Sequence, residues 1–238
     1  MTDALPQGTV SLSGVVLRRI AAREGDLSLY LFLRSAGPVW VSAPGAARGR
    51  VRFGGAVEPL VWGNFNLYKG TRRLYLKSVD VKEDFWLLRK EPLVLRRLLQ
   101  WDSLLCRHLL PGHPSDEVLA LFYWTSLLLA SGVPPGVGEW RFLWRWLSSE
   151  GLAPSLTECP ACGGPLRDCR WTEGGLLCSK CGRGSSGGVL PEEGRALLSL
   201  AASGSPSEVK ARFCGKEEDE GFWRSSAARI LPLFELLG

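Results

Sequence analysis

Four cysteines in two closely spaced pairs constrain the second half of this chain more than any other feature. Cys159 and Cys162 form one C-x-x-C pair, Cys178 and Cys181 form the other, and fifteen residues separate them. Zn²⁺ favours four thiolates in a tetrahedron, and a C-x-x-C turn supplies two of them at a suitable separation. A spacer of about 15–20 residues is typical of a zinc ribbon. A disulfide pair or unrelated thiols is the alternative interpretation. The sequence predicts one Zn²⁺ in a ribbon at residues 159–181.

The predicted metal site has a structural rather than a catalytic role. Four thiolates leave no open coordination position, so the ion would not activate water. Cys169 lies between the two pairs, but its spacing fits neither, and we expect it not to be a ligand. Seven cysteines without a signal peptide indicate a reducing compartment, where thiols stay available for metal. We therefore expect a cytoplasmic protein.

Charge is unevenly distributed along the 238 residues. The net charge is +5, but residues 1–82 hold 12 Lys and Arg against 5 Asp and Glu, whereas the remainder is slightly acidic. A basic first third suggests an anionic partner for that part. The longest uncharged run, residues 118–138, is interrupted by Gly and Pro after Ala130, so no membrane segment is expected.

Residues 9–83 have the pattern of short strands. Apolar residues alternate along residues 27–33, and the pattern continues at Val39 and Val41, over residues 57–62, and at Leu74 and Leu76. Breaks rich in Gly separate these segments. Five short strands in about 75 residues favour a small barrel, of which the five-stranded OB-fold is the commonest candidate.

Near Lys82 the period changes from two to that of a helix. Helices are predicted from Pro92 to about residue 109, over residues 116–130 and 139–149, and near 191–203, 206–214 and 221–237. The predicted fold is therefore a multi-domain α+β protein. An amino-terminal OB-fold β-barrel (residues 1–83) precedes an all-α domain (84–238) that carries the Cys₄ zinc ribbon.

Three stretches resemble the RecO family of bacterial recombination-repair mediators. Residues 14–19 (GVVLRR) and 24–29 (EGDLSL) resemble the opening hairpin of that family. Residues 43–60 (APGAARGRVRFGGAVEPL) are similar to its basic loop and the strand that follows, although the family often has a lysine at the position of Pro44. Residues 142–182 are similar to its helix and ribbon. The resemblance covers most of residues 9–182.

The resemblance implies an OB-fold followed by a helical domain, and a DNA-binding protein that is not an enzyme. Such proteins bind single- and double-stranded DNA, anneal complementary strands, and work with RecR and the single-strand-binding protein to load recombinase. For this chain it implies a cytoplasmic, nucleoid-associated protein. It also implies that the carboxy-terminal tail of the single-strand-binding protein docks on the helical domain.

Basic residues in the first third are the candidate DNA-binding site. Phosphate contacts need cations at backbone spacing, and aromatic rings among them offer platforms for unstacked bases. A solvated charged edge with inward-facing aromatic rings is the alternative. A register shift of one residue exchanges the two faces, so the sequence leaves open which of Trp40, Phe65, Tyr68 and Tyr75 face outward. The candidates are Arg18, Arg19, Arg48, Arg50, Arg52, Lys69, Arg72, Arg73 and Lys77.

The helices offer a candidate partner site for the acidic tail that the resemblance implies. An apolar terminal residue needs a slot, and its carboxylate needs a cation. Slot candidates are Leu93, Leu98, Trp101, Leu105 and Trp124, and the cations are Arg96, Arg97 and Arg107. The alternative is that these apolar side chains fill the core.

Three classes of function remain to be separated. A DNA-binding and annealing mediator is the leading hypothesis, and a protein-interaction adapter without annealing activity is the second. A nucleic-acid enzyme is disfavoured because the sequence has no phosphate loop, nucleophile elbow or H-E-x-x-H motif. The two histidines, His108 and His113, lie near a helix end and are expected to be surface or capping residues.

Overall fold

The chain consists of strands followed by helices and forms two compact units. The computed structural model describes residues 6–22, 25–47, 52–173 and 175–237. The units are Met1–Ala120 and Leu121–Gly238. The change from strands to helices falls after Glu83, close to the expected position. The first unit thus includes helical residues as well as the strands, and the domain boundary at residue 83 stays a prediction.

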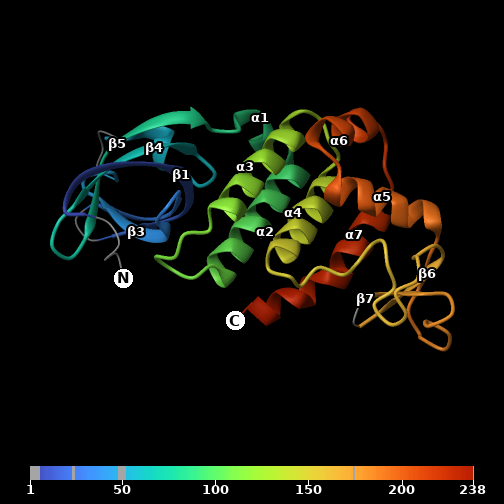
Figure 1. Cartoon of the computed structure of the whole chain (residues 1–238). Coiled ribbons are helices and arrows are strands. Elements are labelled where there is room, and N and C mark those ends of the chain that lie inside the picture. The colour runs from blue at the N-terminus through green and yellow to red at the C-terminus, as the bar shows by residue number, and fades with distance from the viewer. Residues whose placement is uncertain (1–5, 23–24, 48–51, 174, 238) are drawn as a thin grey trace. The chain divides into compact units, whose positions relative to one another are not determined.

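The amino-terminal unit contains a closed five-stranded barrel in the order β1-β2-β3-β5-β4 (Figure 1). All neighbouring strands are antiparallel except β3 and β5, which pair in parallel and close the barrel. This architecture confirms the predicted OB-like barrel. The strands are β1 (Gly8–Ala21), β2 (Leu27–Leu33), β3 (Gly37–Ala43), β4 (Trp62–Lys69) and β5 (Leu74–Glu83).

Alternation along the strands fills the barrel. Leu29, Leu31 and Leu33 are fully buried, as the period-two pattern of β2 predicts. The long strand β1 pairs with β4 through its first part and with β2 through its second. A register shift between Val16 and Arg18 lies in the part that pairs with β2. This shift is a β-bulge, which bends a strand and lets it serve two neighbours.

One expected strand segment, residues 57–62, is not a strand except at its last residue, Trp62. Gly54–Val57 is a 3₁₀ helix (η2), and β4 begins only at Trp62. Pro59 has no N–H to donate to a sheet ladder, and Leu60 has a φ of 70°, which is incompatible with a strand. The apolar run at 57–62 therefore reflects burial of a turn against the barrel, because Val57 and Val61 belong to its core.

Helices follow the barrel as expected. They begin with α1 (Trp86–Arg89), α2 (Pro92–His108) and α3 (Asp116–Ala130). Pro92 occupies the first turn of α2, where its missing N–H costs nothing. Among the residues that the structure describes, no helix has both the length and the apolar character needed to cross a membrane.

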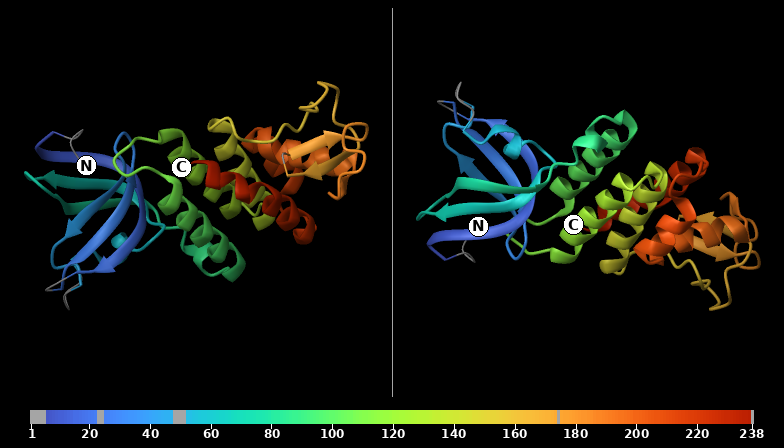
Figure 2. Two further views of the ribbon diagram at one scale, coloured as in Figure 1. Left: turned by 90° about the horizontal axis from the view of Figure 1, so that it is seen from below. Right: turned by 90° about the horizontal axis from the view of Figure 1, so that it is seen from above.

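The carboxy-terminal unit is built around α4 (Pro135–Ser149), which packs against the later helices (Figures 1 and 2). Trp140 Nε1 donates to the Leu198 carbonyl at 2.8 Å, and Arg141 Nη1 donates to the Ala201 carbonyl at 2.8 Å. These bonds join α4 to α5. The remaining elements are α5 (Glu192–Ser203), α6 (Pro206–Phe213), α7 (Glu220–Ile230), the 3₁₀ helix η3 (Leu231–Leu237), and the ribbon strands β6 (Cys169–Thr172), β7 (Gly175–Cys178) and β8 (Val189–Leu190).

Helix α4 starts four residues earlier than predicted. Pro135 and Gly136 suggested a break, but proline is well placed at a helix start. Gly136 is needed for packing, because a Cβ there would lie 2.6 Å from the Cβ of Trp223 in α7. The glycine therefore marks a close helix contact and not the end of a loop.

Candidate metal site and nucleic-acid interface

The ribbon brings the four predicted ligands together. The thiol sulfurs of Cys159, Cys162, Cys178 and Cys181 all lie within 4.8 Å of one another. The Sγ atoms of Cys162 and Cys178 are 3.8 Å apart. Tetrahedral coordination with Zn–S bonds of about 2.3 Å requires sulfur separations of about 3.8 Å. The residues present therefore fit a metal ion held by four thiolates.

Local turns position these sulfurs. The N–H of Gly163 donates to the Cys159 carbonyl at 2.8 Å, and the N–H of Gly182 donates to the Cys178 carbonyl at 2.8 Å. Gly163 has a φ of 69°, a conformation that glycine adopts without strain. Each C-x-x-C pair is thus folded into a tight turn, and the two turns bring their sulfurs together.

Backbone donors favour the thiolate form at two ligands. The N–H of Cys178 points at Cys159 Sγ at 3.5 Å and is the main cause that lowers the pKa of Cys159 to about 6. The N–H of Cys181 donates to Cys178 Sγ at 3.5 Å and lowers the pKa of Cys178. Hydrogen bonds to the charged form stabilise it, and a thiolate is the form that binds metal.

Cys169 stands apart from this cluster. Its side chain is buried and donates to the Leu190 carbonyl at 3.6 Å, and burial raises its pKa to about 11. A neutral buried thiol is a packing group. Trp171 in β6 packs edge-on against Trp140 of α4 at a centroid separation of 6.4 Å, which ties the ribbon to the helices.

The candidate DNA-binding residues are spread over several parts of the barrel. Arg48 and Arg50 of the basic loop lie outside the described residues. Arg52 is exposed, with Nη1 donating to the Pro44 carbonyl at 3.3 Å and its guanidinium 5.1 Å from the centroid of the Phe53 ring.

The β4–β5 hairpin carries a group of exposed cations. Arg72 and Arg73 are exposed there, and Lys77 Nζ lies 5.1 Å from the centroid of the Tyr68 ring. Tyr68 pairs with Tyr75 across the two strands. This hairpin therefore offers cations and an aromatic face together.

Three candidate DNA-binding residues, two on β1 and one on β4, have surroundings that differ from those of the β4–β5 hairpin. Arg19 forms an ion pair with Glu58 at 2.6 Å. Arg18 is exposed and pairs in register with Tyr30. Lys69 is only 8% exposed, because it lies on the same face of β4 as the core residues Phe65 and Leu67. Lys69 is thus a poor candidate for phosphate contact.

The structure settles which aromatic side chains face outward. Trp40 is 48% exposed and Tyr68 is 42% exposed, whereas Phe65 is fully buried in the barrel. Tyr75 is half-buried. The interpretation with all rings turned inward is therefore wrong for Trp40 and Tyr68.

The predicted apolar slot on the helices is not open. Trp101 and Leu105 have no exposed surface and Leu98 is 1% exposed, so these three side chains fill the core. Their helical spacing reflected burial, which was the alternative interpretation. Leu93 and Trp124 are exposed, as are Arg96 and Arg107, while Arg97 is half-buried.

A buried carboxyl group was not identified from the sequence. Asp102 of α2 is 6% exposed, and its Oδ1 has no hydrogen-bond partner among the described residues. Burial raises the pKa of Asp102 to about 7, against the opposing attraction of Arg18. Burial, with Asp102 next in effect, also raises the pKa of Cys106 to about 12. In the sequence, the only indication of this buried carboxyl group is a single acidic residue among the apolar positions of α2.

Comparison with known proteins adds a family assignment to this geometry. The chain matches the family described as "Recombination protein O N terminal" over residues 8–85 and "Recombination protein O C terminal" over residues 103–225. Its relatives include proteins named DNA repair protein RecO. The one from Anaeromyxobacter dehalogenans (strain 2CP-C) is 34% identical over 226 residues, covering 89% of this chain and 87% of the relative.

Two further relatives carry the same name. The protein from Anaeromyxobacter sp. (strain K) is 35% identical over 184 residues, covering 74% of this chain and 71% of the relative. The protein from Desulforamulus reducens is 29% identical over 174 residues, covering 71% and 68% respectively.

Proposed function

Because this chain belongs to the recombination protein O family, we propose that it is a recombination-repair mediator that binds single- and double-stranded DNA and anneals complementary strands. The family resemblance drawn from the sequence is confirmed. By the same proposal, the protein helps to load recombinase together with RecR and the single-strand-binding protein. It does so in the cytoplasm at the nucleoid, and it catalyses no reaction itself.

The exposed aromatic and basic side chains of the barrel are the observation that carries this proposal. Trp40 and Tyr68 are close to half exposed, and Arg72, Arg73 and Lys77 lie on or beside the β4–β5 hairpin. Cations bind the phosphate backbone without regard to sequence, and rings stack on unpaired bases. A protein that anneals strands of any sequence needs these two kinds of contact.

Single-strand affinity measured by fluorescence anisotropy across a salt series tests the proposal. Each phosphate contact contributes about −0.7 to the slope of log affinity against log salt. Replacing Arg72 and Arg73 by Ala together should weaken binding and reduce the slope by about 1.4 if both contact phosphate. The matched control replaces Arg224 and Arg229, two exposed arginines of α7, and should leave the slope unchanged.

Wild-type protein that fails to bind DNA at low salt would refute the proposal. Binding without acceleration of strand annealing would refute only the annealing step. Equal slopes for wild type and the β4–β5 variant would move the phosphate contacts elsewhere on the molecule.

An adapter without annealing activity is the second candidate, and one groove favours it. A cavity of ≈ 310 Å³ near α1 is lined by Val81, Trp86 and Ala56, with Trp86 59% exposed and Val81 43% exposed. Exposed apolar groups that gather in a groove are typical of protein interfaces. DNA affinity that does not depend on salt, together with no annealing, would support this function.

We further propose that the four-cysteine site holds one Zn²⁺ with a structural role. Thiolate ligands in a closed tetrahedral arrangement suit Zn²⁺, and the spacing of the sulfurs agrees with its bond length. The acidic tail of the single-strand-binding protein is proposed to dock beside α2. Arg96, Arg97 and Arg107 are its candidate cations, and Trp101 is excluded as a contact by its burial.

A further inference from the structure

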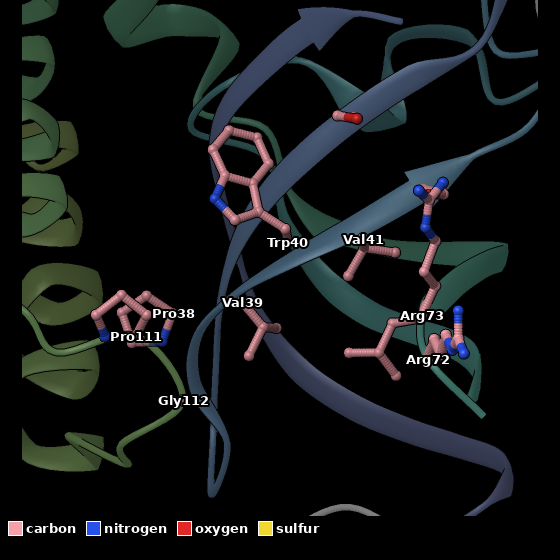
Figure 3. A pocket seen from close by; sticks show the side chains of 11 residues that line it. Pro38, Val39, Trp40, Val41, Arg72, Arg73, Pro111 and Gly112 are labelled. Carbon is pink, nitrogen blue, oxygen red and sulfur yellow. The ribbon is translucent and has the colours of Figure 1, made fainter. Parts of the chain in front are cut away.

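A cavity of ≈ 450 Å³ opens on the barrel where β3 meets the β4–β5 turn (Figure 3). Strand β3 pairs with β5 only at Val41 and Ser42, opposite Leu74 and Tyr75. The cavity lies beside this short pairing, and its volume is within the range of about 300–1,000 Å³ usual for small-ligand sites. It is lined by Ser28, Pro38, Val39, Trp40, Val41, Ser42, Arg72, Arg73, Leu74, Pro111 and Gly112.

The loop after α2 forms one wall of this cavity. The N–H of Gly112 donates to the Pro38 carbonyl at 2.8 Å, which fixes the loop on the first residues of β3. Gly37 has no room for a side chain, because a Cβ there would overlap the His113 carbonyl. In Figure 3, Pro38 and Pro111 lie on one side of the cavity and the two arginines on the other. The wall is thus held in place by backbone contacts.

Trp40 presents an indole ring at this cavity. One side of the ring packs against Tyr30, its cross-strand partner, at a centroid separation of 4.8 Å and an interplanar angle of 34°. Tyr30 is buried and lies on the same face of the sheet, so it supports the indole from one side. The indole itself is 48% exposed, which leaves a large aromatic surface without a protein partner on its outer side.

Charge at the cavity is positive only. Among its lining residues, all of which the structure describes, Arg72 and Arg73 carry charge and no acidic residue is present. The ligand that fits is therefore flat and aromatic at one end and anionic at the other. A nucleotide has both features. A proline-rich peptide would use the indole but leave the two guanidinium groups without an anion.

We propose that this cavity receives one unpaired base of single-stranded nucleic acid, stacked on Trp40, with the adjoining phosphates at Arg72 and Arg73. The inference rests on the proposed DNA-binding function and assigns that function a base-binding position. It selects single strands, because a base within a duplex is already stacked on both faces. It carries no sequence preference, because every base has a face that stacks on an indole.

Two oligonucleotides of equal length and charge separate base stacking from phosphate contact. One is oligothymidylate, and the other has the same backbone with abasic sites. Trp40→Ala should weaken oligothymidylate binding by about 5-fold to 140-fold, the range of base–aromatic stacking, and leave abasic binding unchanged. Trp40→Phe, which keeps a ring, should restore most of the affinity. Leu87→Ala removes a large exposed apolar side chain of the same unit that lines neither cavity, and it serves as the control.

The outcomes distinguish this inference from the proposed function. If wild type binds neither oligonucleotide, the proposed function and the base position both fail. If wild type binds both but Trp40→Ala binds oligothymidylate as tightly as wild type does, only the base position is overturned. Equal losses with both oligonucleotides would also overturn it, because the ring would then act through the shape of the barrel. A proline-rich peptide that binds wild type, loses affinity with Trp40→Ala and displaces no DNA would assign the cavity to a protein instead.

Discussion

We expect Asp102 to reduce the stability of the wild-type protein as the pH rises from about 4 to 7, and Asp102→Asn to remove this contribution. The carboxyl group of Asp102 is buried, and burial raises its pKa from 3.8 to about 7, while Arg18 partly opposes this. A rise of about three pH units, at about 1.4 kcal/mol each, corresponds to ~4 kcal/mol. This is the order of magnitude of the contribution of Asp102 to the free energy of unfolding that is lost when its carboxyl group must ionise.

The sign follows from the two states of the chain. Below about pH 4 the carboxyl group is neutral in both states, so its full contribution to stability is present. As the pH rises, the unfolded chain ionises first, whereas the buried group keeps its proton until about pH 7. Unfolding therefore becomes more favourable over this window, and the loss is complete above the folded-state pKa. Asparagine has nearly the same shape and does not titrate.

Urea unfolding at pH 5 and pH 8 measures the effect. The stability of Asp102→Asn relative to wild type should grow by about 2–3 kcal/mol from pH 5 to pH 8, because groups common to both proteins cancel. Asp80→Asn alters an exposed carboxyl and should show a change of less than about 0.5 kcal/mol. A difference that is the same at both pH values, or that shrinks as pH rises, would refute the placement of Asp102 in an environment that disfavours its charge.

Two further predictions concern the second unit, and a third concerns the proposed partner site beside α2. Cys178→Ser should remove bound metal and lower the melting temperature, whereas Cys169→Ser should leave the metal content unchanged. Elemental analysis of the purified proteins measures the metal content, and a metal-free wild type would contradict the metal site. Gly136→Ala should lower the free energy of unfolding by about 1–3 kcal/mol, because its Cβ would meet Trp223. Gly188 has open space around it, so Gly188→Ala should lower the free energy of unfolding by less than about 0.5 kcal/mol. Equal melting temperatures for the two variants would count against the packing argument. A fluorescent acidic peptide with an apolar last residue should bind this protein and lose affinity when that residue is deleted. Binding that does not change on this deletion would refute the proposed docking site.

The barrel was predictable because its pattern is local and repeated. Alternating leucines along residues 27–33 fix the inner face of one strand, and four cysteines at ribbon spacing fix the metal site. The strand predicted at residues 57–62 was wrong because an apolar run is also compatible with a buried turn. There, Pro59 and the positive φ of Leu60 override the strand propensity of the neighbouring valines.

The functional details needed contacts between distant residues. Trp40 was recognised as one of several aromatic candidates, but its exposure depends on how β3 closes the barrel against β5. The cavity wall at Pro111 could not be foreseen, because nothing in the sequence places that loop against Pro38. Trp101 fills the core rather than a binding slot, and helical spacing alone does not distinguish these two roles.

The short parallel pairing of β3 with β5 would link barrel closure thermodynamically to the proposed ligand binding. Only Val41 and Ser42 of β3 join β5, so this junction is the part of the cylinder held by the fewest ladder bonds. The cavity takes side chains from both sides of the junction, Trp40 from one and Arg72 from the other. A ligand that bridges them would bind only the closed barrel, and we therefore expect it to slow hydrogen exchange at the junction more strongly the tighter it binds.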